Sequence, residues 1–116
     1  MIPYGRQNIS NADIEAVIDV LKSDFLTQGP MVPEFEKALI NRTGAKHAFA
    51  MNSATSALHT ACLALDLGIG DRLWTSPITF VASANAGLYC GATIDFVDID
   101  PETYNMCPKK LEQKLI

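Results

Sequence analysis

The chain has few basic residues. Its 116 residues include nine lysines and arginines against 13 aspartates and glutamates, which gives a net charge of −4. Proteins that bind a nucleic-acid backbone gather cations on one surface, and here Lys109 and Lys110 form the sole basic pair. We therefore expect no nucleic-acid partner.

Long apolar runs are also missing. No run approaches the roughly 20 residues that a membrane-spanning helix needs. The start of the chain carries Arg6 but lacks the apolar segment that a secretory signal would place behind it. These absences predict a cytoplasmic protein with no membrane partner.

Cysteine and histidine are scarce as well. The three cysteines are widely spaced and form no C-x-x-C pair, so neither a disulfide framework nor a metal site is expected. Cys62 and Cys90 are interpreted as small core residues, and the role of Cys107 stays open. His47 and His59 are isolated, which favours packed or surface positions over metal ligation.

What the chain does have is apolar residues in helical and strand-like patterns. They make up 48% of the sequence, enough for one folded domain with a core. Ser10 and Asp13 have the spacing of a capping box and predict a helix start. The helix that follows should bury one face, because apolar residues recur at helical spacing: Ile14, Val17, Ile18 and Leu21.

Beyond this helix, apolar runs alternate with turn residues. Glu34 and Glu36 are expected to complement the dipole at the start of the second helix. The order of elements favours an α/β fold with parallel strands and right-handed crossovers. The expected elements are a helix from Pro33 to Gly44, a strand at 46–51, a helix from Ala54 that Gly68 ends, a strand at 72–75, a helix at 79–89, a strand at 93–97 and a helix at 108–116.

A loop at 23–33 joins the first two helices. Gly29 and Pro30 break regular structure there, and Thr27 and Gln28 offer polar groups beside the flexible glycine. The pattern suits a plain connection and a binding loop equally.

The turn at 52–56 is the most informative stretch. It joins the expected strand at 46–51 to an alanine-rich helix that is predicted to pack closely on a sheet. Amides at a helix start lack intrahelical partners and lie at the positive end of the dipole, so the amides of Ala54 to Ser56, with three hydroxyls nearby, would seat a phosphate or carboxylate. The same residues also suit an ordinary helix start with Ser53 as N-cap, and both interpretations stay open.

Phe80 is ambiguous too. A phenylalanine in the first turn of a helix usually belongs to the core. This one follows the end of an expected strand, where α/β proteins place ligands.

Several motifs in fixed order resemble the DegT/DnrJ/EryC1 family, whose members are sugar aminotransferases that use pyridoxal phosphate. The resemblance covers nearly the whole chain. It implies part of the large domain of an aspartate-aminotransferase-type fold, with a mostly parallel sheet and flanking helices. The motifs are FLTQGP (25–30), PEFE (33–36), NSATSAL (52–58), GD (70–71), TSPITFVASAN (75–85), GA (91–92) and FVDIDP (96–101).

Within the family, two segments look most like the branch that aminates carbon 4 of a UDP-linked 4-keto-6-deoxy-N-acetylhexosamine in pseudaminic acid synthesis. They are LWTSPITF (73–80) and TYNM (103–106). The implied small-molecule partners are therefore a UDP-sugar and an amino donor, expected to be glutamate.

The resemblance assigns roles by position. Ala54 and Thr55 would hold the phosphate of pyridoxal phosphate, and Phe80 would stack on its pyridine ring. Residues 1–30 would form an arm, a helix and a substrate loop, and residues 31–116 the first part of the cofactor-binding domain. The positions that match the nucleotide-sugar pocket are Tyr4, Thr27, Gln28 and Gly29.

Two catalytic groups of the family have no counterpart here. The carboxylate that pairs with the ring nitrogen and the lysine that forms the Schiff base are expected beyond residue 116, and no lysine of this chain stands in that lysine's sequence context. Transamination requires both groups. We therefore expect the chain by itself to be inactive.

Three interpretations follow. The favoured one is the N-terminal portion of a sugar aminotransferase. The second is a dehydratase of the same family, in which histidine replaces the lysine. The third is a non-catalytic, stand-alone α/β fragment that binds an anion or a partner. Since such a piece exposes strand edges and apolar helix faces, we expect a homo-oligomer at micromolar concentration, and a clean monomer in light scattering would contradict this.

Overall fold

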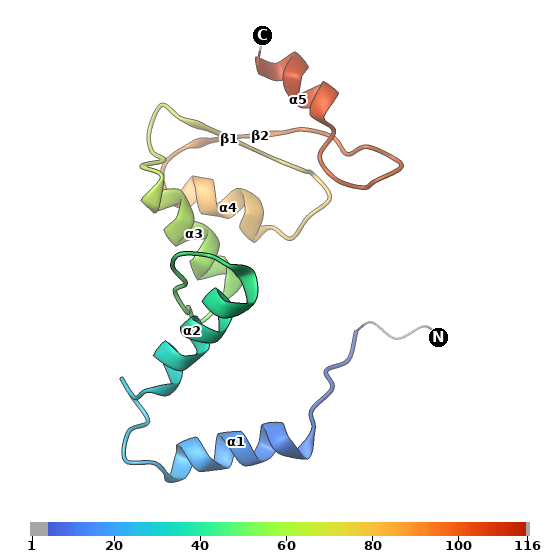
Figure 1. Ribbon diagram of the computed structural model, residues 1–116. Helices are drawn as coiled ribbons and strands as arrows, with labels where there is room; N and C mark the ends of the chain where they lie inside the picture. The colour runs from blue at the N-terminus through green and yellow to red at the C-terminus, as the bar shows by residue number, and fades with distance from the viewer. Residues whose placement is uncertain (1–4, 116) are drawn as a thin grey trace. The chain divides into compact units, whose positions relative to one another are not determined.

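The computed structural model describes residues 5–115. The chain forms two compact units that divide between Ala50 and Met51. The first unit holds α1 (Asn11–Lys22) and α2 (Met31–Thr43). The second unit, as Figure 1 shows, holds α3 (Ala54–Ala64), β1 (Arg72–Thr75), α4 (Ala82–Tyr89), β2 (Thr93–Phe96) and α5 (Pro108–Leu115). Over the described range, no helix combines the length and apolar composition that a bilayer crossing requires.

The start of α1 confirms the predicted capping box. The Asp13 amide donates to Ser10 Oγ at 3.3 Å, and the Ser10 amide donates to Asp13 Oδ2 at 2.7 Å. The Ser10 hydroxyl donates to the same carboxylate oxygen at 2.8 Å. The pKa of Asp13 is therefore held below its usual value, with the Ser10 amide contributing most and the Ser10 hydroxyl next. The local sequence therefore fixes where this helix begins.

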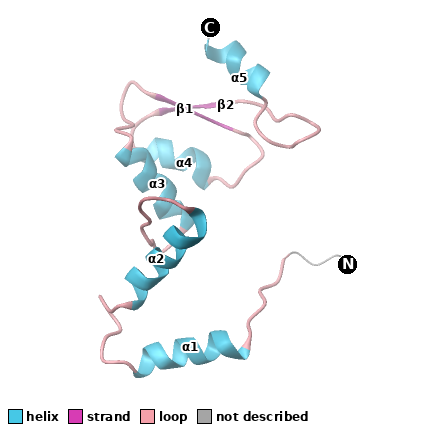
Figure 2. Ribbon diagram, viewed as in Figure 1, coloured by secondary structure: helices cyan, strands magenta, loops and turns pink. Residues whose placement is uncertain are grey.

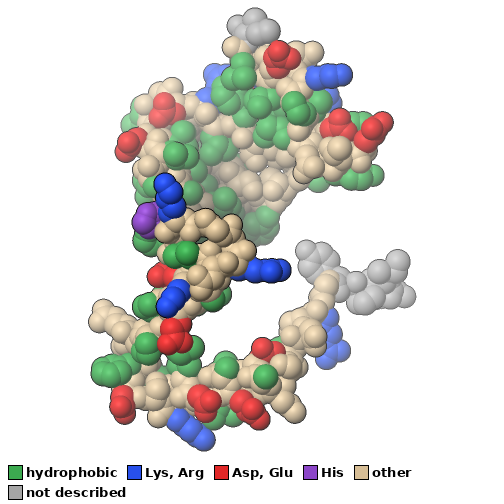
Figure 3. Space-filling view, in the orientation of Figure 1, with side chains coloured by type: hydrophobic (Ala, Val, Ile, Leu, Met, Phe, Trp, Pro, Cys, Tyr) green, Lys and Arg blue, Asp and Glu red, His purple; other side chains and the backbone are tan. Residues whose placement is uncertain are grey.

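The apolar face of α1 is exposed, so the prediction of a buried face is wrong for this chain. Its members are between 39% and 63% exposed: Ile14, Val17, Ile18 and Leu21. Helical spacing shows which face avoids water, but burial also requires another element to cover that face. The space-filling view shows hydrophobic side chains on the surface of the second unit as well (Figure 3).

The segment after α2 differs from the prediction. Gly44 ends α2 as expected, in a left-handed conformation with φ of 74°. The expected strand at 46–51 does not form. A strand needs a neighbouring strand to accept its amides, and here the Ala50 amide donates to Glu36 Oε1 at 2.8 Å. Glu36 therefore anchors this segment, whereas Glu34 lies in the first turn of α2.

The two strands of the second unit confirm the predicted parallel pairing. Leu73 of β1 lies opposite Ile94 of β2, and Trp74 lies opposite Asp95. The helix α4 packs against both strands, on one side of the pair (Figure 2). This approach depends on Gly87, since a Cβ there would lie 2.7 Å from Ile94 Cδ1 and 3.1 Å from Leu73 Cβ.

The alanine-rich α3 packs mainly against α4, which corrects the prediction that it packs on the sheet. It also ends at Ala64, before Gly68. The Leu67 amide donates to the Cys62 carbonyl at 3.1 Å, and Asp66 takes the left-handed conformation with φ of 57°. These are the features of a Schellman motif, with an aspartate where glycine is usual.

The core of the second unit is small and built around α4. This helix begins at Ala82, three residues later than predicted, because 77–79 are bends. The buried hydrophobic side chains among the described residues are Ala82, Ala86, Ala92 and Val97. Cys62 and Cys90, predicted as core residues, are half-buried.

Two ion pairs tie α5 to the end of β2 and the loop that follows it. Lys114 Nζ donates to Asp95 Oδ1 at 2.8 Å and to Oδ2 at 3.0 Å. Lys110 Nζ donates to Asp98 Oδ2 at 2.8 Å. Each lysine is the largest cause that lowers the pKa of its aspartate, and Asp98 in turn raises the pKa of Lys110.

Acidification is expected to release α5. An aspartate whose pKa is lowered in the folded state stabilises that state above its unfolded pKa, and the contribution disappears as the pH falls through the folded pKa. The docking of α5 should therefore be intact at neutral pH and weaken below the ordinary aspartate range. Amide chemical shifts of residues 109–115, followed from pH 6 to pH 2, measure this release.

The doubly neutralised variant is the control. With Asp95→Asn and Asp98→Asn together, the acid step in the shifts of Lys110 and Lys114 should become much smaller. The dependence on alkaline pH has the opposite sign. The interaction that raises the pKa of Lys110 stabilises the folded state below the ordinary lysine pKa, and this contribution is lost as the pH rises through the raised pKa. An acid step of unchanged size in the double variant would contradict the assignment of these two ion pairs.

Candidate cofactor site

The first turn of α3 is capped by Ser53. Its backbone is extended, with φ of −161° and ψ of 156°, and its Oγ accepts from the Ser56 amide at 3.2 Å. The Ala57 amide donates to the Ser53 carbonyl at 3.1 Å. The predicted N-cap is therefore confirmed.

Capping leaves two amides open at the helix start. Within residues 5–115, the amides of Ala54 and Thr55 have no protein acceptor, and neither does the Thr55 hydroxyl. Ser56 was predicted to belong to the same anion seat. Its amide donates to Ser53 Oγ instead, and its hydroxyl accepts from Ser53 Oγ at 3.0 Å. The group available to a ligand is thus narrower than predicted: two adjacent amides and one hydroxyl.

This arrangement suits a phosphate. The open amides lie at the positive end of an 11-residue helix, where dipole and donors favour an anion. Ala54 is exposed and carries only a methyl group, and Thr55 is half-buried with its hydroxyl unused. The residues present therefore fit the phosphate group of pyridoxal phosphate.

Phe80 lies in the second unit, between the end of β1 and the start of α4. Its side chain is 73% exposed, and its carbonyl accepts from the Ser83 amide at 3.0 Å. The residue precedes the helix, so it is not the core phenylalanine of a first helical turn. No hydrogen bond among the described residues links residues 76–80 to the first turn of α3. Exposure leaves the ring free to cover a flat ligand.

The predicted substrate residues belong to the first unit. Thr27, Gln28 and Gly29 lie in the loop between α1 and α2, and Tyr4 lies outside the described residues. Gln28 takes a left-handed conformation with φ of 54°. Gly29 packs directly on Phe25, because a Cβ at Gly29 would lie 2.7 Å from the Phe25 carbonyl oxygen and 3.2 Å from Phe25 Cβ.

We expect Gly29→Ala to disturb this loop. The added methyl group meets a backbone oxygen that cannot move without the loop, so the free energy of unfolding should fall by more than about 1 kcal/mol. Urea unfolding measures the change. Gly5→Ala is the matched control, since a Cβ there meets no atom of residues 5–115 within 4 Å. Equal stability of the two variants would contradict the described loop.

Sequence reasoning missed the role of Glu36. Its pairing with Ala50 holds the chain shortly before the turn at 52–56. The PEFE motif includes this residue, but the sequence predicted that its carboxylate complements the helix dipole. Its carboxylate instead accepts from an amide 14 residues away. Nothing in the spacing points to that distance.

Comparison with known proteins identifies the family. The profile of the DegT/DnrJ/EryC1/StrS aminotransferase family matches residues 7–116. The UDP-4-amino-4,6-dideoxy-N-acetyl-beta-L-altrosamine transaminase of Campylobacter jejuni serotype O:23/36 is 49% identical over 117 aligned residues, covering 100% of this chain and 30% of the relative. The chain thus spans about a third of the length of the curated relatives it matches.

Solved structures agree. PseC of Helicobacter pylori, an aminotransferase of pseudaminic acid biosynthesis, matches with a TM-score of 0.90 and 40% identity, over 98% of this chain and 31% of that one. The PLP form of the putative sugar aminotransferase Spr1654 of Streptococcus pneumoniae matches with a TM-score of 0.89 and 36% identity, over 97% and 29%. The described part of the chain is accordingly a mixed α/β piece of an aminotransferase fold. The chain belongs to the DegT/DnrJ/EryC1/StrS aminotransferase family.

Proposed function

We propose that the full-length protein is a pyridoxal-phosphate-dependent aminotransferase that aminates carbon 4 of a UDP-linked 4-keto-6-deoxy-N-acetylhexosamine, a step toward pseudaminic acid, with glutamate as donor. The observation that carries this proposal is the pair of open amides at the start of α3, in a chain 49% identical to a transaminase of such a sugar. An anion seat alone would fit many ligands. The similarity to a transaminase of such a sugar and to a sugar aminotransferase solved in its PLP form supports this cofactor and this class of sugar.

In this proposal the second unit holds the cofactor. The amides of Ala54 and Thr55 donate to phosphate oxygens, and the Thr55 hydroxyl adds a third donor. Phe80 covers one face of the pyridine ring and excludes water from it. Bound pyridoxal phosphate supplies the conjugated ring that carries the amino group from donor to sugar.

The loop of the first unit binds substrate in this proposal. Thr27 and Gln28 offer side-chain donors and acceptors to the nucleotide sugar, and Gly29 keeps the loop in the shape that packing on Phe25 requires. Tyr4 joins the same pocket. Residues 1–30 then form the arm, helix and substrate loop, and residues 31–116 begin the cofactor-binding domain. We further propose a homodimer, in which some of these groups serve the neighbouring subunit.

The full-length gene product tests the proposal. Its intact mass should be several times that of this chain. With pyridoxal phosphate, glutamate and the UDP-linked 4-keto sugar it should form the 4-amino sugar, detected by mass spectrometry. A dehydrated sugar would instead identify the dehydratase of the same family. A native protein that ends at residue 116 and binds no cofactor would replace the proposal with a stand-alone binding fragment.

A further inference from the structure

Two cysteines lie on helices that pack together. Cys62 belongs to α3, and Cys90 follows the last residue of α4 as its C-cap. Both are free and half-buried, and α3 packs against α4 within the second unit. No role in cofactor or substrate binding has been assigned to either residue.

Two observations place the chain around Cys62 beside the chain around Cys90. His59, almost one turn before Cys62, packs edge-on against Tyr89, which precedes Cys90, with ring centroids 5.3 Å apart. On the other side, the Leu67 amide donates to the Cys62 carbonyl at 3.1 Å.

Gly68, which follows Leu67, lies near Cys90. A Cβ on Gly68 would lie 3.9 Å from the Cys90 carbonyl oxygen. Residues before and after Cys62 therefore both lie near the segment that ends α4.

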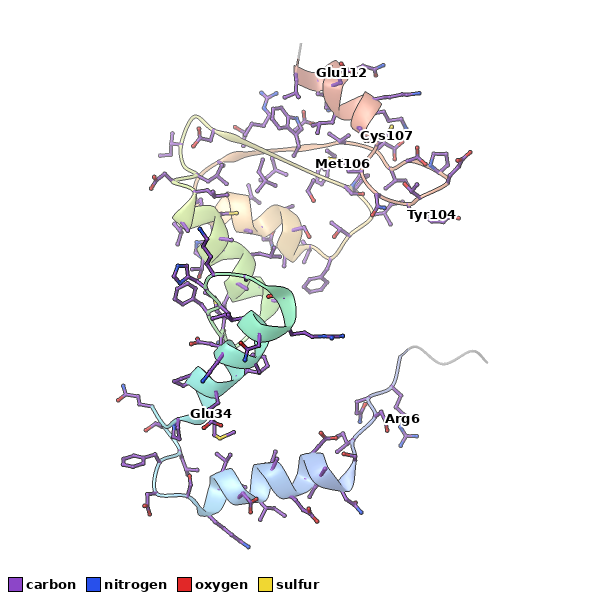
Figure 4. The ribbon with its side chains drawn as sticks, viewed as in Figure 1. Arg6, Glu34, Tyr104, Met106, Cys107 and Glu112 are labelled. Atoms are coloured by element: carbon purple, nitrogen blue, oxygen red, sulfur yellow. The ribbon has the colours of Figure 1, made fainter. Side chains whose placement is uncertain are left out.

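Cys62 also affects the thiol of Cys90. Burial is the main cause that raises the pKa of the Cys90 thiol, and the neighbouring Cys62 is the next. Cys107 is placed differently. It lies at the start of α5, well apart from α3 in Figure 4, and its amide donates to the Asp98 carbonyl at 3.0 Å. Cys62 and Cys90 thus form the pair, and Cys107 serves as an internal control cysteine.

We propose that Cys62 and Cys90 form a reversible intramolecular disulfide when the protein meets a hydroperoxide. The Cys62 thiol loses its proton and, as a thiolate, attacks one peroxide oxygen. The O–O bond breaks and leaves a sulfenic acid and a hydroxide, which takes up the released proton to give water. The Cys90 thiol then attacks the sulfenic sulfur, forms the S–S bond and releases a second water. In total, two thiols and hydrogen peroxide give one disulfide and two waters.

The disulfide joins the two helices of the second unit. One of them, α3, carries the open amides of Ala54 and Thr55 at its far end. The bond would hold the end of α3 to the end of α4 and restrict their separation. The site is therefore a modification site distinct from the proposed cofactor seat, and its test requires no cofactor.

Peptide mapping of the protein at its native length tests the proposal. The protein is treated with hydrogen peroxide, its remaining thiols are alkylated, and it is digested with trypsin and an endoproteinase that cuts before aspartate. Trypsin leaves Cys62 in peptide 47–72 but keeps Cys90 and Cys107 together in 73–109. Cutting before Asp95 separates these two.

The expected major product is a cross-linked pair of peptides carrying Cys62 and Cys90, lighter by two hydrogen atoms than the separate thiol peptides and split by dithiothreitol. Cys107→Ser should leave this product unchanged, while Cys62→Ser and Cys90→Ser should each abolish it. The wild-type map decides the matter even where a variant folds poorly. A major product that links Cys107, or peroxide-treated protein in which Cys62 and Cys90 are alkylated separately, would overturn the proposal.

Discussion

Thr55→Ala in the full-length protein is expected to raise the dissociation constant of pyridoxal phosphate by about ten- to a hundredfold. A hydrogen bond to a charged group contributes about 1.5–3 kcal/mol, and about 1.4 kcal/mol corresponds to a factor of ten. The Thr55 hydroxyl has no protein partner within residues 5–115. Its removal should therefore weaken cofactor binding and leave the stability of α3 unchanged. Absorbance titration with the cofactor measures the change.

Two further variants separate this effect from a general loss of structure. Thr55→Ser keeps the hydroxyl and should bind nearly as well as the wild type. Thr60→Ala removes a hydroxyl from an exposed position farther along α3 and should leave the dissociation constant unchanged. If Thr55→Ala and Thr60→Ala bind the cofactor equally well, Thr55 is not part of the site.

Gly87→Val is expected to lower the free energy of unfolding by about 1–3 kcal/mol, the usual cost of extra methyl groups in a packed core. Gly87 is buried where α4 meets both strands. Even a single Cβ there would come within 3.1 Å of Leu73 Cβ, which is fixed to the backbone of β1. The midpoint of urea unfolding reports the change.

A double-mutant cycle ties this cost to the contact. Ile94 Cδ1 lies 2.7 Å from the position of the added Cβ, so shortening that side chain with Ile94→Ala makes room for a valine at position 87. The cost of Gly87→Val should then be smaller in the Ile94→Ala background. The same cost in both backgrounds would contradict the described packing of α4.

Elements marked by local signals were predictable from the sequence. The capping box of Ser10 and Asp13 fixes the start of α1, and Gly44 ends α2 in a left-handed conformation. Both signals act within three or four residues. The strand at 72–75 was predicted with its observed bounds, and the parallel pairing followed from the alternation of helix and strand.

Features that depend on distant partners were not predictable. The apolar face of α1 carries the right spacing, yet nothing in the sequence says what covers it. The run at 46–51 has strand-like composition, but the Ala50 amide bonds to Glu36. The end of α3 was misplaced because Asp66 takes the left-handed position for which glycine is the common signal.

The same distinction between local signals and distant partners applies to the candidate site. The open amides of Ala54 and Thr55 follow from the predicted helix start, because the first amides of a helix lack intrahelical partners, and their binding of a phosphate stays a prediction. Ser56 was wrongly included, because its amide could serve either the cap or a ligand and the cap takes it. The meeting of Cys62 and Cys90 depends on the packing of α3 on α4 across 28 residues of chain, which spacing alone does not reveal.

A crystal structure of the full-length protein with pyridoxal phosphate bound would show directly whether the start of α3 holds the cofactor phosphate. We expect a phosphate oxygen within hydrogen-bond distance of the Ala54 and Thr55 amides, with the Thr55 hydroxyl donating to the same phosphate. The Phe80 ring should cover the pyridine. A phosphate held elsewhere, with the first turn of α3 facing only water, would contradict the account.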